Sequence, residues 1–124
     1  MTAGRLLIVD DEPDFGEFVR KVAVGMGFEV TVTDRAVAFQ QAYKQVDPTV
    51  LILDIIMPYT DGIELLMWLA DQKCTARIII ATGYTEQYGW MAEILGKAHG
   101  LAFETVLNKP MTPDKLRAAL TGNS

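Results

Sequence analysis

Residues 5–11, Arg-Leu-Leu-Ile-Val-Asp-Asp, decide the fold, because an apolar run ends there at two acidic residues. The pattern returns at residues 49–53, which end at Asp54, and at residues 103–107, which are soon followed by Lys109-Pro110. Short runs of this kind predict strands that are buried on both faces of a parallel sheet. Ligands of such sheets lie at the carboxyl ends of the strands. We therefore expect three carboxylates and one ammonium to meet at one edge of a sheet.

Strand and helix signals alternate along the whole chain. The predicted strands are Arg5–Val9, Phe28–Thr33, Thr49–Leu53, Arg77–Ala81 and Phe103–Leu107. The predicted helices run from Pro13 to about Gly25, from a cap at Asp34 to about Val46, from Gly62 to about Lys73, from Glu86 to Ala98, and onward from a cap at Thr112. A loop is expected from Asp54 to Asp61, shaped by Pro58 and Gly62. This alternation predicts an α/β fold, a doubly wound five-stranded parallel sheet of strand order 2-1-3-4-5 with helices on both faces.

Length and composition predict one soluble domain over residues 1–124, with residues 121–124 as a tail or the stub of a linker. The net charge of −5 argues against a nucleic-acid-binding surface. Cys74 is the only cysteine, which excludes an internal disulfide and suits a reducing cytosol; we expect it in a helix-to-strand connection. No apolar stretch reaches the ~18 residues of a membrane span, and no signal peptide is recognisable. We therefore expect a cytoplasmic protein without membrane contact.

The acidic residues at the predicted sheet edge suit a magnesium ion. Mg²⁺ takes oxygen ligands, keeps several waters and usually binds one or two carboxylates. We expect Asp11 to bind the metal directly, Asp10 to hold a coordinated water, and Asp54 to offer one oxygen to the metal and the other as a nucleophile. Lys109 and the hydroxyl of Thr82 would then contact the oxygens of a phosphoryl group, whose transfer depends mostly on positioning and charge stabilisation. Taken singly, the acidic pair is also compatible with a solvated turn and Asp54 with a cap.

Together these residues resemble a known family. Leu-Leu-Ile-Val-Asp-Asp-Glu-Pro at 6–13, Leu-Asp-Ile-Ile-Met-Pro-Tyr-Thr-Asp-Gly at 53–62, Ala-Thr-Gly at 81–83 and Lys-Pro at 109–110 are similar to the receiver domain of two-component response regulators, whose sheet is flavodoxin-like. The resemblance covers nearly the whole chain.

The resemblance implies that Asp54 is phosphorylated by a sensor histidine kinase or a histidine phosphotransfer protein in a magnesium-dependent step. Asp10 and Asp11 match the acidic pair, Thr82 the switch hydroxyl and Lys109 the family's lysine. The backbone carbonyl of Ile56 matches a further metal ligand. A cis Lys109-Pro110 peptide bond is implied as well, and X–Pro bonds adopt the cis form at small cost.

Two features depart from the common receiver pattern. Val106 stands where many receivers carry Tyr or Phe, so signalling is expected to rely on Thr82 and backbone shifts. The spacing from Thr82 to Lys109 is long, and residues 91–101 are similar to receivers found with EAL-type cyclic diguanylate phosphodiesterases. His99 lies within that segment, where we expect a surface or capping histidine near a helix end.

The output surface is expected on the fourth helix, fifth strand and fifth helix, near Tyr84, Tyr88 and Trp90. It would serve an output domain or a homodimer, since exposed aromatic residues favour interfaces.

Two other functions are compatible with parts of this pattern. A phosphohydrolase with an aspartyl nucleophile needs a second carboxylate two residues later, but Ile56 occupies that position and cannot move a proton. We therefore expect a phosphoacceptor switch rather than an enzyme. A degenerate receiver that acts only as a binding module would have lost an acid, the acceptor or the lysine, all of which this chain retains.

Overall fold

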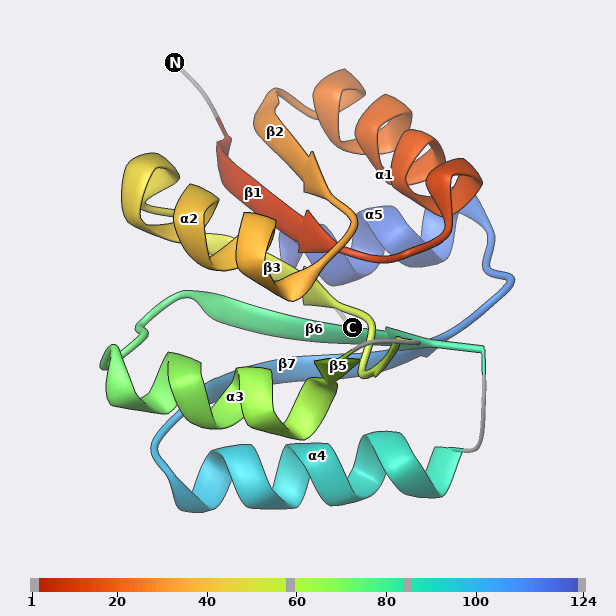
Figure 1. The fold of residues 1–124 in the computed structure, drawn as a ribbon. Helices are drawn as coiled ribbons and strands as arrows, with labels where there is room; N and C mark the ends of the chain where they lie inside the picture. Colours follow the sequence, from red (N-terminus) through yellow and green to blue (C-terminus); the bar gives the residue numbers. More distant parts are fainter. Residues whose placement is uncertain (1–2, 58–59, 84–85, 123–124) are drawn as a thin grey trace.

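The computed structural model describes residues 3–57, 60–83 and 86–122. Within them, a parallel sheet of five strands lies between two layers of helices (Figure 1). The sheet strands are β1 (Gly4–Val9), β2 (Phe28–Thr33), β3 (Val50–Leu53), β6 (Arg77–Thr82) and β7 (Ala102–Asn108). The helices are α1 (Pro13–Gly25), α2 (Ala36–Val46), α3 (Gly62–Asp71), α4 (Glu86–Ala98) and α5 (Pro113–Thr121).

The strands are arranged in the order β2-β1-β3-β6-β7, which confirms the predicted order 2-1-3-4-5 of a doubly wound sheet. Alternate side chains of each strand enter opposite cores. In β1, Leu7 and Val9 face a core shared with α2, α3 and α4, whereas Leu6 and Ile8 face a core shared with α1 and α5. The central strands are therefore apolar at almost every position, as the sequence pattern predicts for strands buried on both faces.

The last strand differs from that expectation. Residues 103–107 of β7 are only partly buried, because β7 is an edge strand with a neighbour, β6, on one side. Phe103 and Val106 still pack against the core beside α3 and α4. The apolar run predicted the strand correctly but not its position at the edge of the sheet.

Two local predictions were wrong. The segment expected as a loop after Asp54 contains two short antiparallel strands, β4 (Ile56–Met57) and β5 (Thr60–Asp61). Asp34 does not cap α2, because the helix begins one residue later, with Arg35 at the N-cap position and no side-chain cap. Asp34 instead forms an exposed ion pair with Arg35 at 3.2 Å.

The helix ends reflect local chemistry. Thr112 caps α5 as predicted, since its hydroxyl accepts a hydrogen bond of 3.2 Å from the N–H of Lys115. Helix α3 ends at Asp71, two residues before the predicted Lys73, which adopts a left-handed conformation with φ 56°. The Lys109-Pro110 peptide bond is cis.

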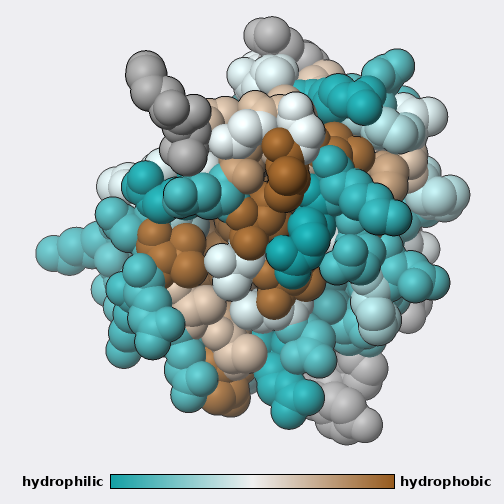
Figure 2. Space-filling model, turned by 90° about the horizontal axis from the view of Figure 1, so that it is seen from above, coloured by the Kyte–Doolittle hydropathy of each residue, from teal (hydrophilic) through white to brown (hydrophobic). Residues whose placement is uncertain are grey.

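The surface is mostly hydrophilic, with apolar side chains between polar ones on the side that carries α1 and β2 (Figure 2). The large hydrophobic residues that are most exposed among the described ones, Val24, Val37 and Ile94, lie on three different helices. Across the described ranges, no helix combines the length and the apolar character needed to cross a membrane.

Candidate functional site

The predicted site residues meet at one edge of the sheet. Asp10 follows β1, Asp54 follows β3, Thr82 ends β6 and Lys109 follows β7. Backbone hydrogen bonds continue past the strand ends and hold these residues in register. The N–H of Asp54 donates to the carbonyl of Val9 at 3.0 Å, and the N–H of Lys109 donates to the carbonyl of Thr82 at 2.9 Å. The positions of these residues are thus set by the sheet itself.

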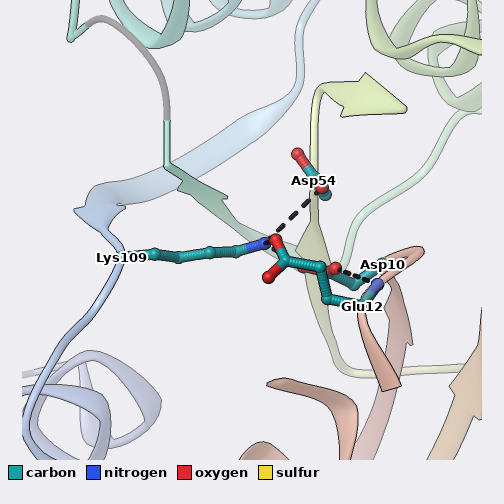
Figure 3. A network of polar contacts seen from close by, with 4 residues as sticks. All are labelled: Asp10, Glu12, Asp54 and Lys109. Carbon is teal, nitrogen blue, oxygen red and sulfur yellow. Dashed lines mark hydrogen bonds and ion pairs between the residues drawn. The ribbon is translucent and has the colours of Figure 1, made fainter. Parts of the chain in front are cut away.

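The ammonium of Lys109 lies among three carboxylates (Figure 3). Its Nζ is 2.5 Å from Asp10 Oδ2, 3.0 Å from Glu12 Oε1 and 3.5 Å from Asp54 Oδ2. The side chain of Lys109 is only 9% exposed, and its Nζ lies 4.5 Å from the centre of the Phe15 ring. A cation over an aromatic face is attracted by the ring, so Phe15 helps to hold this long side chain in the site.

Burial and charge oppose each other at this cluster. Burial raises the pKa of Asp10 above its ordinary value, although the contact with Lys109 and the hydrogen bond from the N–H of Glu12 act in the lowering direction. Burial alone would lower the pKa of Lys109, but the hydrogen bonds with Asp10 and Glu12 and the charge of Asp54 outweigh it and raise the pKa. Lys109 is therefore held as an ammonium, while the buried carboxylate of Asp10 is only partly compensated.

The acidic cluster suits a hard divalent cation. Ligand atoms of Asp10, Asp11, Glu12 and Asp54 all lie within 4.8 Å of one another. Apart from its ion pair with Lys109, the buried Oδ2 of Asp10 has no hydrogen-bond partner. A buried carboxylate oxygen is costly without such a partner. The site thus contains four carboxylates but only one lysine among these residues, so negative charge is in excess. Mg²⁺ would neutralise this excess, and carboxylate oxygens are the ligands it prefers.

The remaining predicted residues differ in burial and in how far the structure describes them. Thr82 is fully buried and Asp54 is 3% exposed, so both lie inside the site. Asp11 is exposed, as a ligand that faces an entering ion would be. Ile56 opens β4, two residues after Asp54, with its backbone in the described part of the chain and its side chain outside it. Pro58 and Tyr84 lie outside the described residues, as do the side chains of Asp61, Tyr88 and Trp90.

Cys74 and His99 lie outside the acidic site and occupy the positions expected for structural roles. Cys74 is buried between α3 and β6 and interacts with the hydroxyl of Tyr43. His99 is exposed just after α4. Both arrangements agree with the sequence-based expectation for these residues.

Sequence reasoning missed Glu12 and Phe15. Both contact Lys109, which is 97 residues from Glu12 in the chain. The signal available was their position, directly after the acidic pair and in the first turn of α1. A helix that begins at a strand's carboxyl end presents its first residues to the same site.

The family of the chain follows from its sequence as well as its geometry. Residues 6–121 match the model of the response regulator receiver domain. The chain belongs to this family. Receiver domains use Mg²⁺ at an acidic pocket, and the cluster of Asp10, Asp11, Glu12 and Asp54 lies at the corresponding edge of the sheet.

Individual relatives agree with this assignment. The transcriptional regulatory protein FixJ of Bradyrhizobium diazoefficiens is 29% identical over 96% of this chain and 56% of its own length. The chemotaxis protein CheY of Listeria monocytogenes is 26% identical over 94% of each protein. The crystal structure of chemotaxis protein CheY4 of Vibrio cholerae shares the fold, with a TM-score of 0.83, 24% identity and 98% coverage of both chains. The chain spans 56% of the length of FixJ and 46% of the length of the transcriptional regulatory protein GltR of Pseudomonas aeruginosa.

Proposed function

We propose that Asp54 accepts a phosphoryl group from a sensor histidine kinase or a histidine phosphotransfer protein in a magnesium-dependent reaction. The observation that carries this proposal is the convergence of Asp54, Asp10 and the ammonium of Lys109 at the carboxyl edge of the sheet. The Asp54 carboxylate is an activated acceptor only where charge on the phosphoryl oxygens is stabilised, and Lys109 provides one such charge.

The reaction transfers one phosphoryl group and nothing else. An oxygen of Asp54 forms a bond to phosphorus while the bond from phosphorus to the donor's histidine nitrogen breaks, and that nitrogen keeps the electron pair and takes up a proton. Lys109 neutralises the phosphoryl oxygens, and the Thr82 hydroxyl donates to one of them. Asp10, Asp11, Asp54 and the backbone carbonyl of Ile56 would hold Mg²⁺, which supplies further charge neutralisation for this group.

The chain acts as a switch rather than a turnover enzyme in this proposal. Ile56 stands two residues after Asp54, where an apolar side chain cannot transfer a proton for rapid hydrolysis. Phosphorylation replaces the single negative charge of the Asp54 carboxylate with a phosphoryl group of about −1.5 to −2 charges at neutral pH, and this larger charge draws Thr82 and Lys109 toward Asp54. A ligand that binds one of two conformations more tightly shifts the population toward that conformation. The phosphoryl group would likewise favour the conformation in which Thr82 and Lys109 lie close to Asp54.

The output is proposed to pass through α4, β7 and α5, to an output domain or to a second copy of the chain in the cytoplasm. The transcriptional regulatory proteins FixJ and GltR are about twice as long as the segment that this chain matches, which supports an additional output segment in such proteins. The resemblance of residues 91–101 to receivers associated with EAL-type phosphodiesterases supports such a domain as one specific output.

Intact mass spectrometry tests the proposal. The protein is incubated with acetyl phosphate and Mg²⁺, with chelator in place of Mg²⁺, and as the Asp54→Ala variant. We expect a gain of about 80 Da for one phosphoryl group, only in the unsubstituted protein with Mg²⁺. An unmodified protein that still binds Mg²⁺ would favour the binding-module alternative, and a beryllofluoride titration would distinguish that outcome from rapid hydrolysis.

A further inference from the structure

Glu12 occupies an unusual position for a residue at the start of a helix. It is the N-cap residue of α1, yet its side chain makes no cap hydrogen bond. Its N–H donates to Asp10 Oδ1 at 2.9 Å, and its carbonyl accepts from the N–H of Gly16 at 3.2 Å. The backbone of Glu12 is thus held by hydrogen bonds through both its N–H and its carbonyl. Its carboxylate extends across the site to Lys109 (Figure 3).

We propose that Glu12 is a positioning residue that holds Lys109 in the unphosphorylated protein and competes with the phosphoryl oxygens for its ammonium. The inference rests on the proposed function, because it assigns a regulator to the same site. Glu12 Oε1 lies 3.0 Å from Lys109 Nζ, closer than Asp54 Oδ2 at 3.5 Å. A lysine ammonium has three N–H donors, and the carboxylates of Asp10, Glu12 and Asp54 surround them.

Glu12 is the partner that can leave. Its side chain is 62% exposed, whereas those of Asp10 and Asp54 are 0% and 3% exposed. A carboxylate that returns to water regains its hydration, but a buried one that loses its cation is left uncompensated. A phosphoryl group on Asp54 would therefore displace Glu12 from Lys109, while Asp10 and the ring of Phe15 keep the ammonium in the site.

The competition between Glu12 and the phosphoryl oxygens should change the phosphorylation rate only modestly. Solvent-exposed ion pairs contribute roughly the equivalent of up to a five-fold change in an equilibrium constant, and the exposed carboxylate of Glu12 places its contact with Lys109 near this range. Loss of the Glu12 contact should therefore accelerate phosphorylation of Asp54 by about two- to five-fold at saturating Mg²⁺. Glu12 would set the rate at which the site is phosphorylated without forming part of the acceptor.

Three single variants test this inference by the time course of the mass gain with acetyl phosphate. Glu12→Gln removes the charge. Glu12→Asp keeps the charge but shortens the side chain by about one carbon–carbon bond, ~1.5 Å, so that it no longer reaches Lys109. Glu17→Gln is the matched control, because Glu17 is an exposed acid of α1 that pairs with Arg20 at 3.2 Å. We expect Glu12→Gln and Glu12→Asp to react two- to five-fold faster and the control to react at the unsubstituted rate.

A double-mutant cycle with Lys109→Ala shows whether Glu12 acts through the lysine. In the slower Lys109→Ala background, followed over longer times, Glu12→Gln should leave the rate unchanged. Acceleration that persists there, a Glu12→Asp rate equal to that of the unsubstituted protein, or no acceleration in Glu12→Gln would each overturn the inference. Failure of the proposed function would look different, because no variant, nor the unsubstituted protein, would gain mass.

Discussion

Alanine in place of Gly62, the glycine that begins α3, should destabilise the protein, because the added methyl group meets backbone rather than a movable side chain. A Cβ at Gly62 would lie 2.3 Å from Ile55 Cα, 2.5 Å from Ile55 O and 2.8 Å from Ile55 C. Ile55 is 1% exposed and follows Asp54 directly. The clash can be relieved only if the chain beside the proposed acceptor moves or α3 shifts away from it.

The expected cost combines two opposing effects. Overpacking a close-packed region costs about 1–3 kcal/mol, whereas alanine is preferred over glycine in a helix by roughly 0.5–1 kcal/mol. Gly62→Ala should therefore lower the free energy of unfolding by about 1–2 kcal/mol. For a domain of this size, that corresponds to a decrease in melting temperature of about 4–8 °C.

Urea and thermal unfolding followed by circular dichroism measure this difference. Gly25→Ala is the matched control, because Gly25 is the last residue of α1 and a Cβ there would meet no atom within 4 Å. The control should be as stable as the unsubstituted protein or slightly more stable. If Gly62→Ala matched Gly25→Ala in stability, the close contact between α3 and Ile55 would be refuted as a constraint on the site.

Three further predictions concern the metal, a helix cap and a buried phenol. Mg²⁺ should raise the melting temperature, by the equivalent of about 2.7 kcal/mol at one hundred times its dissociation constant; Asp11→Asn should weaken this response, and an equal response would contradict the metal site. Thr112→Ala should lower the free energy of unfolding by about 0.5–2 kcal/mol. Thr112→Ser keeps the hydroxyl that accepts a hydrogen bond from the N–H of Lys115, so it should retain most of the stability that the cap contributes. Chemical denaturation of both variants measures the difference. Burial of Tyr43 and its hydrogen bond with Cys74 raise the pKa of the phenol. The associated stabilisation is therefore full below about pH 10, the pKa of an unfolded tyrosine, and decreases as the pH rises further. Tyr43→Phe should show a shallower loss of stability between about pH 9 and 11. An unchanged slope would contradict a raised pKa of the Tyr43 phenol.

The sheet and most of the site were predictable because they depend on local patterns. Continuous apolar runs mark the central strands, and the residues that end them, Asp10, Asp54 and Thr82, lie at one edge because parallel strands all point the same way. The same pattern placed Lys109 at this edge, and the family resemblance added the cis Lys109-Pro110 peptide bond. These features need no knowledge of how distant side chains pack.

What the sequence did not reveal depends on contacts between distant segments. The pairing of β4 with β5 needs only four residues with no apolar alternation to mark it. The partial exposure of β7 follows from its place at the edge of the sheet. The pairing of Glu12 with Lys109 joins side chains 97 positions apart, and a propensity for helix capping gives no indication of it.

The central claim is that Asp54 carries the phosphoryl group, and chemical mapping of the modified residue tests it most directly. Borohydride reduces an aspartyl phosphate to homoserine, so peptide mass spectrometry after phosphorylation and reduction identifies the acceptor. The account predicts conversion at residue 54, dependent on Mg²⁺. Conversion at Asp10 or Asp11 instead, or a stable adduct on a residue other than an aspartate, would contradict it.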